Sequence, residues 1–252
     1  MYYQLVEALR DQIRSGELKP GAQLPPERDL GEQYGISRMT ARQAVQYLIR
    51  EDALIAKQGS GTFVAEPKLT YDPLHVLGFT EDMMRRGADA TSRVIEQALV
   101  EPPPSIAKQI QLRAKERATR IVRLRLSNNV PMLLETVYVP TKRFIGLERA
   151  NLAKQSLYQL MRDRYGVRVS GSHHTIEAVQ AKDYETELFG MHPCMPMILL
   201  RGVTYDEADQ PVEYFKAVYR GDKFQIQMDS RKSQANRAPE AKNASLMSVV
   251  MR

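Results

Sequence analysis

The sequence has a single cysteine, Cys194, only four histidines and no long run of apolar residues. One cysteine excludes an internal disulfide, which fits a reducing cytoplasm. The absence of an 18-residue apolar run, a signal peptide and a lipidation motif predicts a soluble, cytoplasmic protein that makes no membrane contact. The adjacent His173 and His174 would point to opposite faces of a strand, so they do not form a metal site. No nucleophile motif or cofactor loop is present, and we expect neither a metal nor a cofactor.

The positive charge is unevenly distributed along the chain. The formal net charge is +6, but residues 230–252 alone contain five basic residues and one acidic residue. This stretch is polar and largely without periodicity, so we predict a disordered basic tail. Residues 1–65 contain eight basic and eight acidic residues. A nucleic-acid-binding role for this segment therefore requires its basic side chains to gather on one face.

Residues 26–50 have the pattern of two helices joined by a tight turn. Pro26, followed by Glu27 and Asp29, is typical of a helix start. Gly35 can adopt the left-handed conformation that ends this helix, and Ser37 is a natural N-cap for the next one. The second helix has apolar residues at three- and four-residue spacing, which predicts a helix-turn-helix. The residues expected on its buried face are Ala41, Ala44, Val45, Leu48 and Ile49.

Polar side chains at the start of the second helix predict contact with DNA. Residues at this end of such a helix reach base edges or flanking phosphates in the major groove. Arginine can bond guanine O6 and N7 together, and threonine can contact a phosphate or a thymine methyl group. The exposed residues are Arg38, Thr40, Arg42, Gln43 and Gln46.

A glycine-rich hairpin is expected directly after the second helix. Two short strands, 54–55 and 62–64, flank Lys57, Gln58 and Gly59, and together they predict a wing whose tip approaches a groove or a phosphate.

Residues 24–64 resemble the winged helix-turn-helix of the GntR family of bacterial transcription regulators. The likeness rests on Leu24–Leu30, on the pattern from Ser37 to Ala44, and on Gly59–Val64. Met39 stands where the family often has threonine, and Lys57 where arginine is common. The resemblance implies binding to double-stranded operator DNA. The implied contact residues are Arg28, Ser37, Arg38, Thr40, Arg42, Lys57, Gln58, Gly59 and Thr62.

The chain beyond residue 65 alternates strand and helix patterns. We place a domain of residues 1–65, a proline-bracketed linker at 66–74, a second domain at 75–229 and the tail after it. Hairpin spacing dominates, which predicts an antiparallel sheet in an α+β domain. The expected strands are 93–100, 119–126, 132–139, 173–181, 197–205 and 212–220. The expected helices are 80–86, 104–112, 151–164 and 183–189.

Polar residues on these strands predict a ligand site. Arg123 and Arg125 share one strand face, which suggests an anion clamp. Glu135 would lie opposite Arg123 on that face if the turn at 127–131 includes one bulged residue, whereas a plain two-residue turn would place it on the other face. Glu213 and Tyr219 also share a face. Together these residues suit a ligand with an anionic end and hydroxyl or amine groups, although each ion pair taken singly is more typical of a structural role.

The same residues resemble the UTRA effector domain, which defines the HutC subfamily of GntR regulators. The likeness covers about residues 3–227 and is greatest to amino-sugar (N-acetylglucosamine utilisation) repressors that bind glucosamine 6-phosphate or N-acetylglucosamine 6-phosphate. Related members respond to urocanate, trehalose 6-phosphate, fatty acids or phosphonate-related ligands. The resemblance implies that the phosphate is held by Phe79, Thr80, Arg123, Arg125, Ser156 and Tyr158. It implies that the sugar hydroxyls or amine are held by Glu135, Glu213 and Tyr219.

Two other functions are considered. The UTRA domain resembles chorismate lyase in fold, so an enzyme with acid–base groups at Glu135, Glu213 and Tyr219 is conceivable. Fold similarity does not transfer function, and we expect no enzymatic activity. A DNA-binding module joined to a ligand-free protein-interaction domain is the other alternative, and paired Arg123 and Arg125 argue against it. We expect a homodimer that binds a palindromic operator and is released by its ligand.

Overall fold

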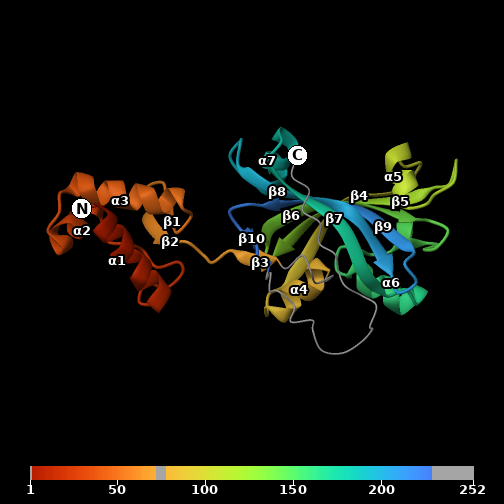
Figure 1. The fold of residues 1–252 in the computed structure, drawn as a ribbon, viewed down its shortest axis with the longest axis horizontal. Helices are drawn as coiled ribbons and strands as arrows, with labels where there is room; N and C mark the ends of the chain where they lie inside the picture. Colours follow the sequence, from red (N-terminus) through yellow and green to blue (C-terminus); the bar gives the residue numbers. More distant parts are fainter. Residues whose placement is uncertain (1, 72–77, 229–252) are drawn as a thin grey trace, which may run out of the picture.

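The computed structural model describes residues 2–71 and 78–228, which form a helical N-terminal unit and a sheet-based unit (Figure 1). Residues 72–74 of the expected linker and the expected tail at 230–252 lie outside the described residues. Among the helices in the described ranges, none is both long and apolar enough to cross a lipid bilayer.

The N-terminal unit consists of three helices and a two-stranded hairpin. Its elements are α1 (Tyr2–Ser15), α2 (Glu27–Tyr34), α3 (Arg38–Arg50), β1 (Leu54–Lys57) and β2 (Gly61–Val64). Pro26 is the N-cap of α2, and Gly35, with a φ of 63°, ends that helix in the left-handed conformation. The Ser37 hydroxyl accepts a hydrogen bond of 3.1 Å from the Thr40 amide and so caps α3. These local contacts produce the sharp turn between α2 and α3.

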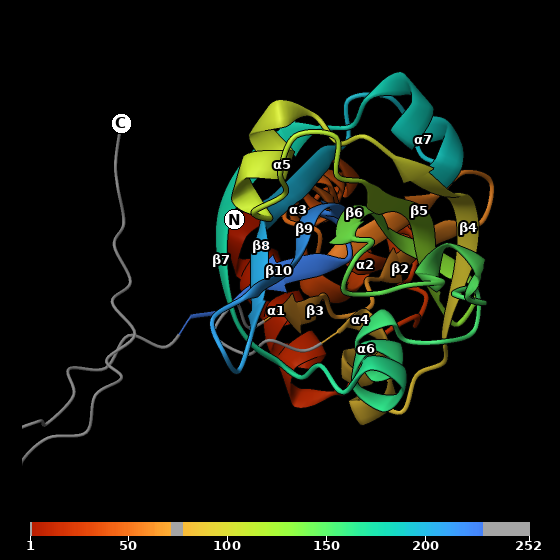
Figure 2. The same ribbon diagram turned by 90° about the vertical axis from the view of Figure 1, so that its right-hand side faces the viewer.

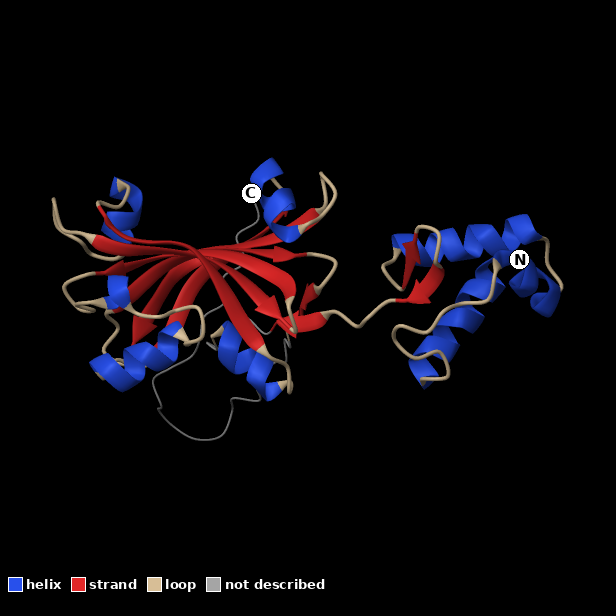
Figure 3. Ribbon diagram, turned by 180° about the vertical axis from the view of Figure 1, so that it is seen from behind, coloured by secondary structure: helices blue, strands red, loops and turns tan. Residues whose placement is uncertain are grey.

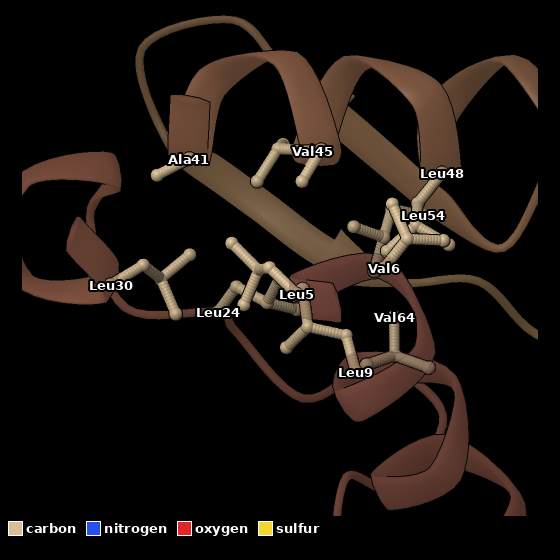
Figure 4. Packing of buried hydrophobic residues seen from close by; sticks show 11 residues of the cluster. Leu5, Val6, Leu9, Leu24, Leu30, Ala41, Val45, Leu48, Leu54 and Val64 are labelled. Atoms are coloured by element: carbon tan, nitrogen blue, oxygen red, sulfur yellow. The ribbon is translucent and has the colours of Figure 1, made fainter. Parts of the chain in front are cut away.

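An apolar cluster fixes the position of α3 within this unit. Ala41, Val45 and Leu48 of α3 lie in one buried cluster with residues of α1, α2 and the hairpin (Figure 4). Removing this apolar surface from water is the main force that holds the helices together. Ile49, which was expected on the buried face, is only partly buried. The buried residues of the cluster are Leu5, Val6, Leu9, Leu24, Leu30, Ala41, Ala44, Val45, Leu48, Leu54 and Val64.

The second unit is built on a six-stranded antiparallel sheet with the order β4-β5-β6-β9-β8-β7. The sheet strands are β4 (Ala90–Val100), β5 (Ala118–Ser127), β6 (Val130–Pro140), β7 (Val169–Gln180), β8 (Pro196–Asp206) and β9 (Pro211–Arg220). Each contains, within a residue or so at its ends, one of the six predicted strands, so the antiparallel α+β prediction is confirmed. A separate parallel pair joins β3 (Leu69–Tyr71), which lies in the expected linker segment, to β10 (Phe224–Ile226).

Helices cover both faces of the large sheet. The elements are α4 (Phe79–Arg85), α5 (Pro104–Gln109), η1 (Leu147–Arg149), α6 (Leu157–Tyr165) and α7 (Asp183–Phe189). Figures 2 and 3 show α4 and α6 on one face and α5 and α7 on the other. Separate apolar clusters lie on the two sides, one including Leu157 and Met161 of α6 and the other including Phe189 of α7.

The predicted helix at 151–164 is shorter than expected. It begins at Leu157, because the Ser156 side chain caps it by accepting a hydrogen bond from the Gln159 amide at 3.3 Å. Before it, residues 152–154 form a turn. Ser156 therefore lies at the N-terminus of α6 and not inside the helix, as the expected range implied. The helix predicted at 104–112 likewise ends early, at Gln109.

The turn between β5 and β6 decides which face Glu135 occupies. Asn128 and Asn129 both have positive φ, as a two-residue hairpin turn requires. The register then shifts: Leu126 pairs with Pro131 but Arg125 pairs with Leu133, which leaves Met132 as an extra residue. The two-residue turn and the bulge therefore occur together, and Glu135 pairs with Arg123 on the same face of the sheet.

Candidate DNA interface and effector pocket

The start of α3 presents two arginines that share one carboxylate. Glu27, in the first turn of α2, lies 3.6 Å from Arg38 Nε and 4.0 Å from Arg42 Nε. Both guanidinium groups are otherwise largely exposed. The Thr40 hydroxyl lies 2.9 Å from that of Ser37, so the Ser37 side chain is occupied with capping. Folding thus turns both arginines outward at the end of the helix that such motifs present to DNA.

The other residues expected to contact DNA lie on α2 and on the wing. Arg28, Arg38 and Thr62 line one hollow formed by α2, α3 and the wing. Lys57 lies with its ammonium 4.6 Å from the centre of the Phe63 ring, and Gln58 and Gly59 are exposed at the hairpin tip. A unit of neutral net charge thus exposes cationic groups on α2, α3 and the wing, and phosphate attraction requires them to face the DNA together. Their contacts with DNA stay a prediction.

A cavity in the second unit brings together every residue predicted to bind the effector. The predicted residues that line it are Phe79, Thr80, Arg123, Arg125, Glu135, Ser156, Tyr158, Glu213 and Tyr219. The sequence analysis missed further lining residues, namely Tyr71, Gly78, Val137, Leu157, Ser172, Thr204, Phe215 and Ala217. Val137 lies two residues from Glu135, and Phe215 and Ala217 lie two and four residues from Glu213. The alternation of side chains along each strand could therefore have placed all three on the cavity face. Ser172 and Thr204 depend on the pairing of distant strands and carried no such signal.

Two buried guanidinium groups, those of Arg123 and Arg125, line the cavity. Arg123 lies 2.5 Å and Arg125 2.9 Å from the same oxygen of Glu135, Oε1. Arg125 also donates to the Thr80 hydroxyl at 2.6 Å, and its guanidinium lies 4.9 Å from the centre of the Phe79 ring. Burial acts to raise the pKa of Glu135, but the two guanidinium charges outweigh it and hold this pKa below its ordinary value. Glu135 is therefore ionised at neutral pH.

The cavity also contains a second buried carboxyl group, that of Glu213. One oxygen of Glu213 accepts hydrogen bonds from the Tyr158 hydroxyl at 2.6 Å and from the Thr204 hydroxyl at 3.2 Å. Burial raises the pKa of Glu213 to about 7, so protonated and ionised forms coexist near neutral pH. Burial also raises the pKa of Tyr158 and of Tyr219 well above the ordinary value, which keeps both phenols protonated and able to donate.

Several polar atoms at the cavity have no partner among the described residues. They are Nε and Nη1 of Arg123, Nε of Arg125 and Oε2 of Glu213. Leaving a buried polar group without a hydrogen bond costs about 1–3 kcal/mol, and such groups are uncommon in folded proteins. Unpartnered donors on the two arginines and an unpartnered oxygen on Glu213 therefore fit a ligand with an anionic end and a hydrogen-bond donor. The N-terminus of α6 adds free amides beside Ser156.

The two adjacent histidines do not line the cavity. His173 is exposed while His174 is half-buried, with Nδ1 3.1 Å from the Ser172 hydroxyl, so the two rings lie on opposite faces as predicted. No group of histidine, cysteine, aspartate and glutamate within residues 2–71 and 78–228 has an arrangement that could hold a metal ion.

Both units match known protein families. "Bacterial regulatory proteins, gntR family" matches residues 1–64, and "UTRA domain" matches residues 85–225. The HTH-type transcriptional repressor NagR of Bacillus subtilis is 34% identical over 224 residues, which cover 89% of this chain and 92% of NagR. The mannosyl-D-glycerate transport/metabolism system repressor MngR of Escherichia coli is 28% identical over 228 residues, which cover 90% of this chain and 94% of MngR.

A solved structure shares the fold across both units. The crystal structure of PhnF from Mycobacterium smegmatis has a TM-score of 0.63 at 28% identity and covers 90% of this chain and 100% of the PhnF chain. The relatives are named as transcriptional repressors and not as enzymes, so the regulatory prediction is confirmed and the enzyme alternative is set aside. The chain belongs to the GntR family of bacterial regulatory proteins and is a transcriptional repressor of the HutC type with a UTRA effector domain.

Proposed function

We propose that this repressor leaves its operator when a phosphorylated amino sugar, glucosamine 6-phosphate or N-acetylglucosamine 6-phosphate, binds the cavity. The observation that carries the proposal is the pair of buried guanidiniums, Arg123 and Arg125, whose unpartnered N–H groups line the same cavity as the unpartnered oxygen of Glu213. The likeness to amino-sugar repressors supports the choice of ligand.

The guanidinium groups of Arg123 and Arg125 suit a phosphate group. Arginine presents planar N–H donors that match phosphate oxygens, and charge-assisted hydrogen bonds of this kind are about twice as strong as neutral ones. Glu135 already neutralises part of the charge of Arg123 and Arg125 with a single oxygen. The partly protonated state of Glu213 leaves the cavity with an excess of positive charge near neutral pH. A phosphate can use the remaining donors together with Thr80 and the free amides at Ser156.

The Glu213 carboxyl group and the Tyr219 phenol suit the sugar. The free oxygen of Glu213 can accept from a hydroxyl, or pair with the ammonium group of glucosamine 6-phosphate. The Tyr219 phenol, which stays protonated, can donate to a ring or hydroxyl oxygen. The aromatic ring of Phe215 and the small Ala217 lie between these two residues along β9 and give the sugar an apolar surface.

Release requires that the ligand favour one arrangement of the two DNA-binding units. We propose a homodimer whose two α3 helices lie about 34 Å apart on a palindromic double-stranded operator. The proposed division is a DNA-binding domain at 1–65, a linker at 66–74 and an effector domain at 75–229. A coupling free energy of about 1–3 kcal/mol would reduce operator affinity by about 5- to 150-fold.

The test is operator binding measured by fluorescence anisotropy, with and without each sugar phosphate. The unsubstituted protein should bind tightly and lose affinity on addition of ligand. Urocanate, trehalose 6-phosphate and a phosphonate serve as the alternative effectors, and release by one of these alone would replace the amino sugar while keeping the repressor class.

A variant pair tests the pocket itself. Arg123→Ala together with Arg125→Ala should keep operator binding and abolish release, whereas Arg201→Ala, which removes an exposed arginine paired with Glu177, should respond normally. Because loss of both arginines leaves Glu135 buried without a partner, Arg125→Lys provides a milder change that keeps the charge but removes the planar donors. Normal release in both pocket variants would refute the assignment of the cavity.

A further inference from the structure

Met39 is a large apolar side chain left in solvent at the start of α3. About 69% of its surface is exposed, and it is absent from the buried cluster that holds the N-terminal unit together. Single exposed apolar residues are common on protein surfaces, so exposure alone assigns no role. A role is instead indicated by the position of Met39 relative to its neighbours on α3.

The direction of Met39 follows from the geometry of the helix. At about 100° per residue, Met39 lies roughly 160° around the helix from Ala41 and roughly 180° from Leu48. Ala41 and Leu48 point into the core (Figure 4), so Met39 points directly away from it. On the same count Arg42 lies about 60° from Met39 and Gln43 about 40° from it. Met39 thus lies at the centre of the outward face of α3, in its first turn.

We propose that Met39 is a specificity-determining residue that packs against the 5-methyl group of a thymine in the major groove of the operator. The inference rests on the DNA-binding role proposed for the start of α3. Of the base-edge groups in the major groove, the thymine methyl is the apolar one, and side chains recognise it by apolar contact. The flexible thioether side chain can adapt to such a contact but has no donor for a phosphate.

The neighbouring side chains leave this contact to Met39. Arg38 and Arg42 have their Nε atoms turned toward Glu27, so their terminal nitrogens remain for guanine or phosphate. Gln43, exposed one turn later, offers an amide that suits adenine. The outward face therefore combines polar readers with one apolar reader, and thymine is the base that the apolar reader selects.

The experiment replaces operator thymines one at a time with deoxyuridine, which lacks only the methyl group. An operator is first selected from random duplex DNA with the full-length protein, and affinities are measured by anisotropy for the unsubstituted protein, Met39→Ala, Met39→Leu and Gln43→Ala. One position in each half-site should weaken binding of the unsubstituted protein by about fourfold, the effect of one methyl-sized apolar contact. The same replacement should have no effect on Met39→Ala.

The control variants make the result specific. Met39→Leu and Gln43→Ala should keep the deoxyuridine effect, because one retains an apolar side chain and the other leaves Met39 in place. An equal deoxyuridine effect in Met39→Ala and in the unsubstituted protein, or no effect at any thymine, would overturn the proposal. Failure to select any DNA with the unsubstituted protein would instead refute the DNA-binding role on which it rests.

Discussion

Glu213 provides a test of the buried pocket that needs no ligand. Its pKa is raised from 4.5 to about 7 by burial, so the folded protein binds this proton more tightly than the unfolded chain does. The stability that the proton contributes is complete below the unfolded pKa and is lost as pH rises through about 7. Glu213→Gln removes the titration and keeps an oxygen that can accept from Tyr158.

The size of the effect follows from the two pKa values. With a folded pKa of about 7 and an unfolded pKa of 4.5, the native state loses roughly 1 kcal/mol between about pH 6 and about pH 8. For a unit of this size, 1 kcal/mol corresponds to about 2–4 °C in melting temperature. The melting temperature of the unsubstituted protein, measured relative to that of Glu213→Gln, should therefore fall by about 2–4 °C over this range.

The assay is thermal unfolding followed by circular dichroism, since the chain has no tryptophan to report on unfolding by fluorescence. Burial lowers the pKa of His174, which acts in the opposite direction, but His174 is present in both proteins and its effect cancels in the difference. Glu177→Gln, at a half-exposed glutamate on β7, is the matched control and should follow the unsubstituted protein. A difference between Glu213→Gln and the unsubstituted protein that stays constant from pH 6 to pH 8 would refute the account of Glu213.

Three further substitutions test the interface and the framework. Arg42→Ala should weaken operator binding by about 1–3 kcal/mol in anisotropy titrations while effector binding is retained, and unchanged affinity would rule out a guanine contact. Ser37→Ala removes the cap of α3 and should cost about 1 kcal/mol in urea unfolding of the N-terminal unit, so an unchanged midpoint would contradict the capping role. Gly202→Ala would place a methyl group 2.1 Å from the His173 carbonyl oxygen and should destabilise the sheet by about 1–3 kcal/mol. Gly171→Ala, with no atom within 4 Å, is its control, and equal melting temperatures for the two would argue against the close β7–β8 contact.

Local signals in the sequence predicted the DNA-binding unit well. Ser37 and Gly35 act within a few residues of their own positions, as an N-cap and as a left-handed helix end, so no distant contact is needed to interpret them. The six sheet strands were also predicted from their own residues, because apolar and polar side chains alternate within each segment. The helix expected at 151–164 was too long because helical spacing continued past the cap, and the Ser156 hydrogen bond marks its true start.

The pocket depended on one residue that the sequence left undecided. Met132 is the extra residue in β6, and it keeps Glu135 on the face of Arg123. A register that differs by one residue reverses the face of every following side chain, so hairpin turn chemistry alone could not choose between the two alternatives. The Asn128–Asn129 turn, read by itself, favours the face away from the arginines.

The sequence by itself determined the class of the protein and which residues share a face within one strand, because capping residues and alternating side chains act over a few neighbouring positions. Tertiary structure alone decided which faces meet. Pairing of β6 with β9, and of β9 with β8, brings Glu135, Glu213 and Thr204 into one cavity from positions far apart in the chain. Burial within that cavity then raises the pKa of Glu213 and leaves arginine donors unpartnered, and both effects arise from the loss of water, which no single segment can impose.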